Sequence, residues 1–199
     1  MKLLLYGGTF DPPHLGHMNN LRAAMELIAP DRVIVMPAGI PPHKAASSTP
    51  AEQRLAMCGC FTALGPGVGV SRWEIDRAGR SYTVETLEML HRAYLGAELY
   101  LSIGSDMLLT FREWHDWQRI LELAVLVVES RQGGDAPALH RMADSLRADG
   151  GRVLFAHAPA FECASSTLRA RLKAGDTTAR ELLPPPVPEL IDEYELYKS

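Results

Sequence analysis

Residues 7–17, GGTFDPPHLGH, constrain the fold more than any other stretch of this 199-residue chain. They follow a short apolar run at 3–6 and precede apolar positions at helical spacing up to Ile28, so they are predicted to join a strand to a helix. The adjacent glycines let a ligand approach the main chain, and the two prolines suit the start of a helix. The free amides and the dipole of that first turn favour an anion.

His14 and His17 are three residues apart, which places both imidazoles on one face of the helix if it begins near His14. A backbone anion site with two donor side chains suits phosphate chemistry. A turn glycine and an ordinary histidine would each explain part of the pattern, but the combination is hard to obtain for structural reasons alone. The stretch fits neither the dinucleotide fingerprint G-x-G-x-x-G nor the P-loop.

The rest of the chain alternates strand and helix signals, which predicts an α/β, Rossmann-like parallel sheet with helices on both faces. Strands are expected at 31–37, 68–75, 99–103, 124–128 and 151–156, and helices at 52–64, 84–94, 137–146 and 187–197. Thr49 is expected to cap one helix, and Thr83 or Ser81 another. We expect one domain over 1–199, with a helical C-terminal part from about 164 to 199.

The composition limits the kinds of binding partner and the cellular compartment that we expect for this protein. The net charge of −4 argues against a nucleic-acid binder, and the N-terminal apolar run is too short for a signal peptide or a membrane span. Cys58, Cys60 and Cys163 form no zinc pattern and are expected to be reduced thiols, the first two buried. We therefore expect a cytoplasmic protein that binds neither membrane nor nucleic acid. The sequence does not define the oligomeric state.

Three later segments carry polar residues where a strand is expected to end. The proline-rich loop 38–50 presents Lys44, either as a phosphate ligand or as an ordinary solvated lysine. Asp106, after Gly104, either caps a helix or accepts a hydrogen bond from a ribose. Hydroxyl residues at 165–167 either cap a helix or accompany a second anion site, onto which Arg169 can fork.

These motifs resemble the nucleotidyltransferase superfamily with the H-x-G-H signature, here residues 14–17, and most closely the bacterial nicotinate mononucleotide adenylyltransferases. The similarity extends over nearly the whole chain and includes I-P-P-H-K at 40–44, S-Y-T at 81–83 and L-P-x-x-V near the C-terminus. Two segments depart from the family pattern. Ala164 replaces the first serine of S-S-T, and Ser130 and Gln132 replace residues of K-R-P-G.

The resemblance implies two sets of binding residues. For ATP they are Gly8, Thr9, Phe10, His14, His17, Gly104, Asp106, Ser165, Ser166 and Arg169. For the pyridine mononucleotide they are Lys44, Thr83, Trp114 and His115, with Trp114 against the ring. His14, His17 and Arg169 are the expected catalytic residues, and Mg²⁺ is expected to arrive with ATP rather than in a protein metal site.

The implied reaction is transfer of AMP from ATP to nicotinate mononucleotide, giving deamido-NAD and pyrophosphate in NAD biosynthesis. Nicotinamide mononucleotide or another phosphate acceptor is the alternative within the same chemistry. A nucleotide-binding sensor without turnover is the alternative from another class, although the histidines and Arg169 are all present. A zinc hydrolase on His14, His17 and Asp11 lacks a clear further ligand.

Overall fold

A computed structural model describes residues 1–39, 49–77, 79–131, 137–159, 161 and 164–198. Within them, six strands form one parallel sheet in the order β3-β2-β1-β4-β5-β6. Their bounds are β1 (Lys2–Gly8), β2 (Arg32–Pro37), β3 (Val68–Val70), β4 (Glu98–Gly104), β5 (Ala124–Arg131) and β6 (Val153–Ala158). This order is that of a doubly wound sheet, and it reverses direction between β1 and β4. The predicted Rossmann-like fold is confirmed.

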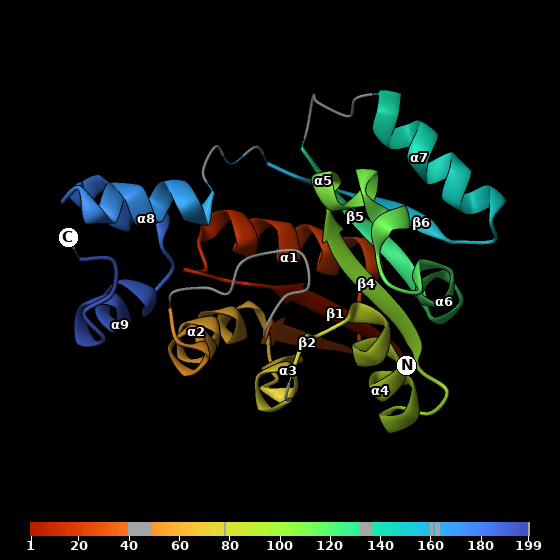
Figure 1. Ribbon diagram of the computed structural model, residues 1–199, viewed down its shortest axis with the longest axis horizontal. Helices are drawn as coiled ribbons and strands as arrows, with labels where there is room; N and C mark the ends of the chain where they lie inside the picture. The colour runs from red at the N-terminus through yellow and green to blue at the C-terminus, as the bar shows by residue number, and fades with distance from the viewer. Residues whose placement is uncertain (40–48, 78, 132–136, 160, 162–163, 199) are drawn as a thin grey trace.

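Helices cover both faces of the sheet (Figure 1). The face covered by the longest helix carries α1 (Leu15–Ile28), α2 (Ala51–Cys58), the 3₁₀ segment η1 (Gly59–Leu64), α8 (Ser165–Lys173), η3 (Thr177–Leu182) and α9 (Val187–Glu193). The opposite face carries α4 (Thr83–Ala93), α5 (Ser105–Leu109), η2 (Phe111–Glu113), α6 (Trp117–Leu123) and α7 (Pro137–Ala148). A short helix, α3 (Trp73–Asp76), follows β3.

The central strand β1 explains why two helical layers are needed. Leu4 and Tyr6 belong to one buried core, whereas Leu3 and Leu5 belong to the other. A parallel strand buried on both faces is expected to be continuously apolar, as this one is. The apolar segment before residue 7 therefore fixes β1 in the middle of the sheet, and its carboxyl end places the following loop at the switch point.

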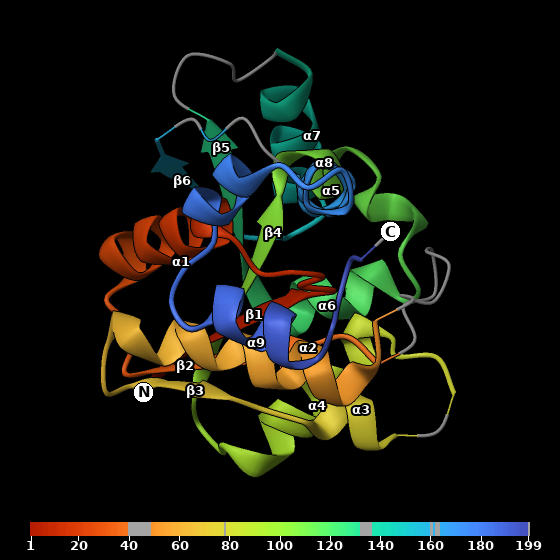
Figure 2. The same ribbon diagram turned by 90° about the vertical axis from the view of Figure 1, so that its left-hand side faces the viewer.

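The C-terminal elements lie at one end of the molecule, where α1 also begins. Figure 1 shows α8 and α9 together at the left, and Figure 2 views that end directly. Val187 and Ile191 of α9 are buried in the same core as α1 and α2. Residues 164–198 thus lie at the edge of the sheet from which the loop 7–17 emerges. No described helix is both long enough and apolar enough to cross a bilayer.

Several predicted boundaries were wrong for local reasons. The strand expected at 68–75 ends at Val70, and Arg72 then pairs with Asp76 at i,i+4 spacing, which supports the turn of α3. The helix expected at 52–64 changes to 3₁₀ geometry at Gly59, and the C-terminal helix ends at Glu193 rather than 197.

The predicted helix caps were also wrong. Pro50 and Tyr82 occupy the N-cap positions of α2 and α4 and make no side-chain cap hydrogen bond. The Thr49 hydroxyl instead donates to Asp11 Oδ1 at 2.6 Å. Ser81 directs its hydroxyl toward the carbonyl of Glu74, 3.5 Å away. These hydroxyls serve tertiary contacts that local sequence patterns do not reveal.

The close approach of α3 to the end of β2 gives a test of the packing. A Cβ atom on Gly39 would lie 2.2 Å from the carbonyl oxygen of Glu74, so Gly39→Ala is expected to reduce the free energy of unfolding by about 2 kcal/mol. Gly69→Ala in β3, where the added atom meets nothing within 4 Å, should change it by less than about 0.5 kcal/mol. Urea denaturation of both variants measures the difference, and equal stabilities would contradict the packing.

Candidate active site

A cavity of about 510 Å³ opens at the carboxyl edge of the sheet, where the strand order reverses. Ligands of open α/β sheets bind at this position. Eleven of the predicted site residues line it: Gly8, Thr9, Phe10, His14, His17, Thr83, Gly104, Asp106, Trp114, His115 and Ser165. Residues predicted for ATP and for the mononucleotide thus share one cavity.

Two predicted residues lie near the cavity without lining it, and one lies outside the described part of the chain. Ser166 and Arg169 belong to α8 but are not among the lining residues. Lys44, like Gln132 and Cys163, lies outside the described residues. Cys58 and Cys60 are buried free thiols, as expected.

His14 and His17 begin α1 with reciprocal hydrogen bonds. The His17 amide donates to His14 Nδ1 at 3.3 Å, and the His14 amide donates to His17 Nδ1 at 3.2 Å. The two rings stack with their centroids 3.7 Å apart. Because each Nδ1 accepts an amide hydrogen, each neutral ring carries its proton on Nε2 and keeps a donor there. The prediction that both imidazoles share one face of the first turn is confirmed.

Burial decides the charge of one of these rings. His14 is only 6% exposed, and burial lowers its pKa from 6.5 to about 4. Phe161 stacks on the opposite side of this ring with a centroid separation of 5.4 Å. His14 is therefore a neutral N–H donor at physiological pH, rather than a cation, before any anion enters the cavity.

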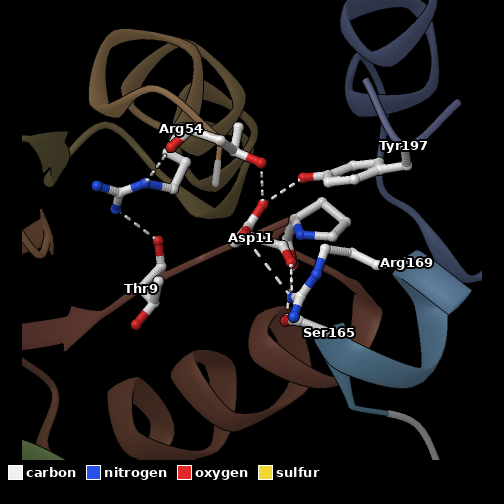
Figure 3. Close-up of polar contacts among 8 residues, drawn as sticks. Thr9, Asp11, Arg54, Ser165, Arg169 and Tyr197 are labelled. Carbon is white, nitrogen blue, oxygen red and sulfur yellow. Dashed lines mark hydrogen bonds and ion pairs between the residues drawn. The ribbon is translucent and has the colours of Figure 1, made fainter. Parts of the chain in front are cut away.

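Two side chains of α8, at the second predicted anion site, donate hydrogen bonds to main-chain carbonyls of the loop that forms the first. Arg169 Nη1 donates to the Asp11 carbonyl at 2.6 Å, and Ser165 Oγ donates to the Pro12 carbonyl at 3.0 Å (Figure 3). Helix α8 begins after Ala164, whose side chain makes no cap hydrogen bond. The expected hydroxyl cap is absent because alanine occupies the N-cap position, and the Ser165 hydroxyl, in the first residue of α8, binds the neighbouring loop. The start of α8 thus lies against the loop that leads into α1.

The other end of the cavity is aromatic. Trp114 and Tyr82 line it together with Thr83 and His115, and the ring of Tyr82 lies 4.6 Å from that of His115. The indole Nε1 of Trp114 is buried and has no hydrogen-bond partner among the described residues. A buried donor without a partner costs free energy unless a ligand accepts from it. By contrast, the ring of Trp117 packs against Arg112, whose guanidinium carbon lies 4.6 Å from the centroid of that ring.

Asp106 stands at the start of α5 rather than capping it. The N-cap residue is Gly104, with no side-chain cap bond, and Asp106 follows two positions later. A Cβ on Gly104 would lie 2.7 Å from Asp106 Oδ1, so the absence of a side chain at 104 gives this carboxylate room. Of the two roles predicted for Asp106, the ribose contact remains compatible with the geometry.

Sequence analysis missed Glu129, which lines the cavity at the end of β5. Its carboxylate accepts hydrogen bonds from Ser102 Oγ at 2.8 Å and Asn20 Nδ2 at 2.7 Å. Burial, with a smaller contribution from nearby Asp106, raises its pKa to about 7 against the opposing effect of these two donors. No local motif marks this residue, since a single glutamate at a strand end is common.

Sequence analysis also missed the contacts of Arg54 and Tyr197. Arg54 is 2% exposed and donates to the carbonyls of Thr9 at 2.9 Å and Thr49 at 3.3 Å. Tyr197 Oη donates to Asp11 Oδ1 at 2.5 Å. An arginine within the short helix α2 and a tyrosine near the C-terminus carry no sequence signal of such roles.

Comparison with known proteins identifies the class to which this fold and site belong. The cytidylyltransferase-like family model matches residues 5–171, and the chain belongs to that family. Over its full length it is similar to proteins named "probable nicotinate-nucleotide adenylyltransferase". The Acidithiobacillus ferrooxidans protein is 40% identical, with 99% of this chain and 96% of that protein covered. The Symbiobacterium thermophilum protein is 37% identical, with 98% and 95% covered. Within the family, the chain therefore groups with the nicotinate-nucleotide adenylyltransferases.

Solved structures agree on the fold. The Plasmodium falciparum nicotinic acid mononucleotide adenylyltransferase complexed with NaAD superposes with a TM-score of 0.78 at 15% identity, over 98% of this chain and 97% of that one. A putative nicotinate-nucleotide adenylyltransferase from Vibrio parahaemolyticus gives a TM-score of 0.66 at 21% identity, over 100% and 97%. At these identities the likeness establishes the shared architecture.

The raised pKa of Glu129 predicts how stability depends on pH. The folded state keeps this proton up to about pH 7, whereas an unfolded glutamate releases it near 4.5, so stability is lost as the pH rises through this window. Between pH 5 and 8 the wild type should lose about 2 kcal/mol more unfolding free energy than Glu129→Gln. Urea titrations at both pH values measure this, with Glu193→Gln as an exposed control. Parallel pH dependences of wild type and Glu129→Gln would contradict the assignment.

Proposed function

We propose that this protein transfers the adenylyl group of ATP to nicotinate mononucleotide, releasing deamido-NAD and pyrophosphate in NAD biosynthesis. One observation carries the proposal: a single cavity holds the paired imidazoles of α1, the start of α8 and the aromatic group around Trp114. The names of its full-length relatives support the same reaction. The Plasmodium neighbour, which is complexed with NaAD, adds a shared fold with a dinucleotide complex.

The mechanism needs no protein nucleophile. An oxygen of the mononucleotide 5′-phosphate attacks the α-phosphorus of ATP in line, and the bond from that phosphorus to the bridging oxygen of the β-phosphate breaks. Pyrophosphate leaves with the electron pair. The attacking phosphate is already ionised, so the protein contributes positioning and stabilisation of charge on the phosphoryl oxygens.

We assign the stabilising donors to both helix starts. The Nε2–H groups of His14 and His17 donate to oxygens of the α- and β-phosphates, and the first amides of α8 meet the triphosphate from the other side. Arg169, whose side chain is 36% exposed beside this helix start, would fork onto the same phosphates. Gly8, Thr9 and Phe10 supply the wall at the end of β1, and Ser166 the first turn of α8.

The metal in this reaction belongs to the substrate. The described residues contain no group of three or more histidine, cysteine or carboxylate side chains placed to hold an ion. The cavity does supply carboxylate oxygens from Asp106, which suit a hard divalent cation as a single contact. We therefore propose that ATP enters as its Mg²⁺ complex, in which the ion neutralises phosphate charge.

The aromatic end would receive the mononucleotide. The indole of Trp114 supplies a flat surface for a pyridine ring and an unpartnered N–H, while Thr83 and His115 lie beside it. Lys44 belongs to this set by family resemblance. Nicotinamide mononucleotide is the alternative acceptor, because acid and amide differ only at one substituent of the same ring. We further propose that residues 1–199 act as one nucleotidyltransferase domain, with the helical segment from 164 completing the site.

Pyrophosphate release from Mg²⁺ and ATP tests the acceptor directly. With the two pyridine mononucleotides offered side by side, we expect turnover with nicotinate mononucleotide and a kcat/KM at least about tenfold lower with the amide, the discrimination expected when a polar substituent is mispaired. Equal rates would make the acceptor dual. Binding of ATP without turnover of either acceptor would favour the sensor alternative.

His17→Ala tests the catalytic histidine. Loss of one donor to the transition state should lower kcat by roughly 10² or more, equivalent to about 2.7 kcal/mol, while the fold remains intact. The exposed His91 of α4 provides the control, since His91→Ala should leave kcat unchanged. Steady-state rates and circular dichroism of both variants decide the matter. Near-normal turnover of His17→Ala would remove the assignment.

A further inference from the structure

Asp11 joins three distant parts of the chain to the loop that leads into α1 (Figure 3). Its carboxylate is 4% exposed, and Oδ1 accepts hydrogen bonds from Thr49 Oγ1 at 2.6 Å and Tyr197 Oη at 2.5 Å. Oδ2 lies 3.7 Å from Arg169 Nη1, which donates to the Asp11 main-chain carbonyl. These partners are 38, 186 and 158 positions away in the sequence.

The arrangement controls how strongly Asp11 competes for Arg169. A carboxylate and a guanidinium favour a bidentate pair with N–O distances below 3 Å. Here two hydroxyls donate to Oδ1, and the distance from Oδ2 to Arg169 Nη1 is 3.7 Å, which is an ion pair but too long for a hydrogen bond. Arg169 is thereby kept next to the loop by the Asp11 carbonyl without being locked onto the carboxylate.

Tyr197 provides this hydrogen bond from the segment after α9, where its side chain also packs against the core. Helix α9 ends at Glu193, and the core contributed by Val187 and Ile191 precedes that end. The chain then turns back through positive φ angles of 55° at Glu195 and 54° at Tyr197. Such backbone conformations cost free energy for residues other than glycine, so tertiary contacts must hold them. The hydrogen bond to Asp11 is such a contact.

The tyrosine is a durable donor. Burial and the hydrogen bond to Asp11 both raise its pKa well above the ordinary value, so the hydroxyl keeps its proton throughout the physiological range. Arg54, buried on the other side of the loop, is bound to the carbonyls of Thr9 and Thr49. The Tyr197 hydroxyl and the buried Arg54 guanidinium therefore hold the loop from two different elements.

We propose that Tyr197 is a positioning residue for ATP: by holding Asp11 Oδ1, its hydroxyl leaves the Arg169 guanidinium available to the triphosphate and fixes the loop before His14. This inference rests on the proposed function. Without the Tyr197 hydroxyl, Oδ1 loses one of these two donors, so the carboxylate can shift toward Arg169 and form the close pair, which would compete with phosphate. The affinity for ATP should therefore decrease, while the affinity for the mononucleotide stays the same.

Tyr197→Phe is the direct test, with Tyr194→Phe as its matched control. Tyr194 lies three residues earlier, is half-buried, and has no hydrogen-bond partner for its hydroxyl among the described residues. We expect Tyr197→Phe to raise the KM for ATP and the Kd of a non-hydrolysable ATP analogue with Mg²⁺ by about five- to tenfold, as the loss of one hydrogen bond to a charged group would do. The KM for nicotinate mononucleotide should stay within about twofold, and Tyr194→Phe should match the wild type.

Two further measurements keep the outcome decisive. Thr49→Val removes the other donor to the same oxygen and should weaken ATP binding in the same way. This variant replaces the test if Tyr197→Phe does not fold. Calorimetric Kd values for the ATP analogue decide the inference even if the wild type turns over neither mononucleotide, an outcome that would refute only the proposed function. Unchanged ATP binding in Tyr197→Phe, or equal losses of ATP and mononucleotide affinity, would overturn the inference.

Discussion

The reciprocal hydrogen bonds between His14 and His17 are the interaction on which the site depends. Each imidazole satisfies one amide at the start of α1, so the helix begins with its own side chains bound to the main chain. The same bonds fix the tautomer of both rings and direct a donor away from the backbone. The helix start, the ring orientation and the donor nitrogen are thus set by one local arrangement at the end of the central strand.

Under the proposed function, anion recognition would rely on directed N–H groups more than on net charge. The chain carries a net charge of −4, His14 is neutral by burial, and the cavity contains the carboxylates of Asp106 and Glu129. In a cavity partly closed to water, an oriented dipole acts more strongly than it would in solvent and needs no reorganisation during the reaction.

The sequence predicted what depends on local patterns. Alternating strand and helix signals indicated the sheet, and the motif at 7–17 correctly placed the start of α1 at His14. Prediction from the sequence failed where a side chain binds a partner that is distant in the chain. Thr49 looked like a helix cap but binds Asp11, and Ser165 looked like a cap but binds Pro12, because tertiary hydrogen bonds compete with local ones. Glu129 and Tyr197 were missed for the same reason.

The departure at Ala164 can be understood from the same competition. A serine at the N-cap would satisfy an amide of α8 with its own hydroxyl, whereas Ala164 has no such group and makes no side-chain cap bond. The next hydroxyl, that of Ser165, is bound to Pro12 and ties the helix to the loop. The first amides of α8 are thereby left without a competing side-chain acceptor in the cap position. In this chain the helix start is held in place by its neighbour. Under the proposed function its amides stay available to the phosphates, so loss of the family's first serine would remove a hydroxyl without removing the proposed anion site.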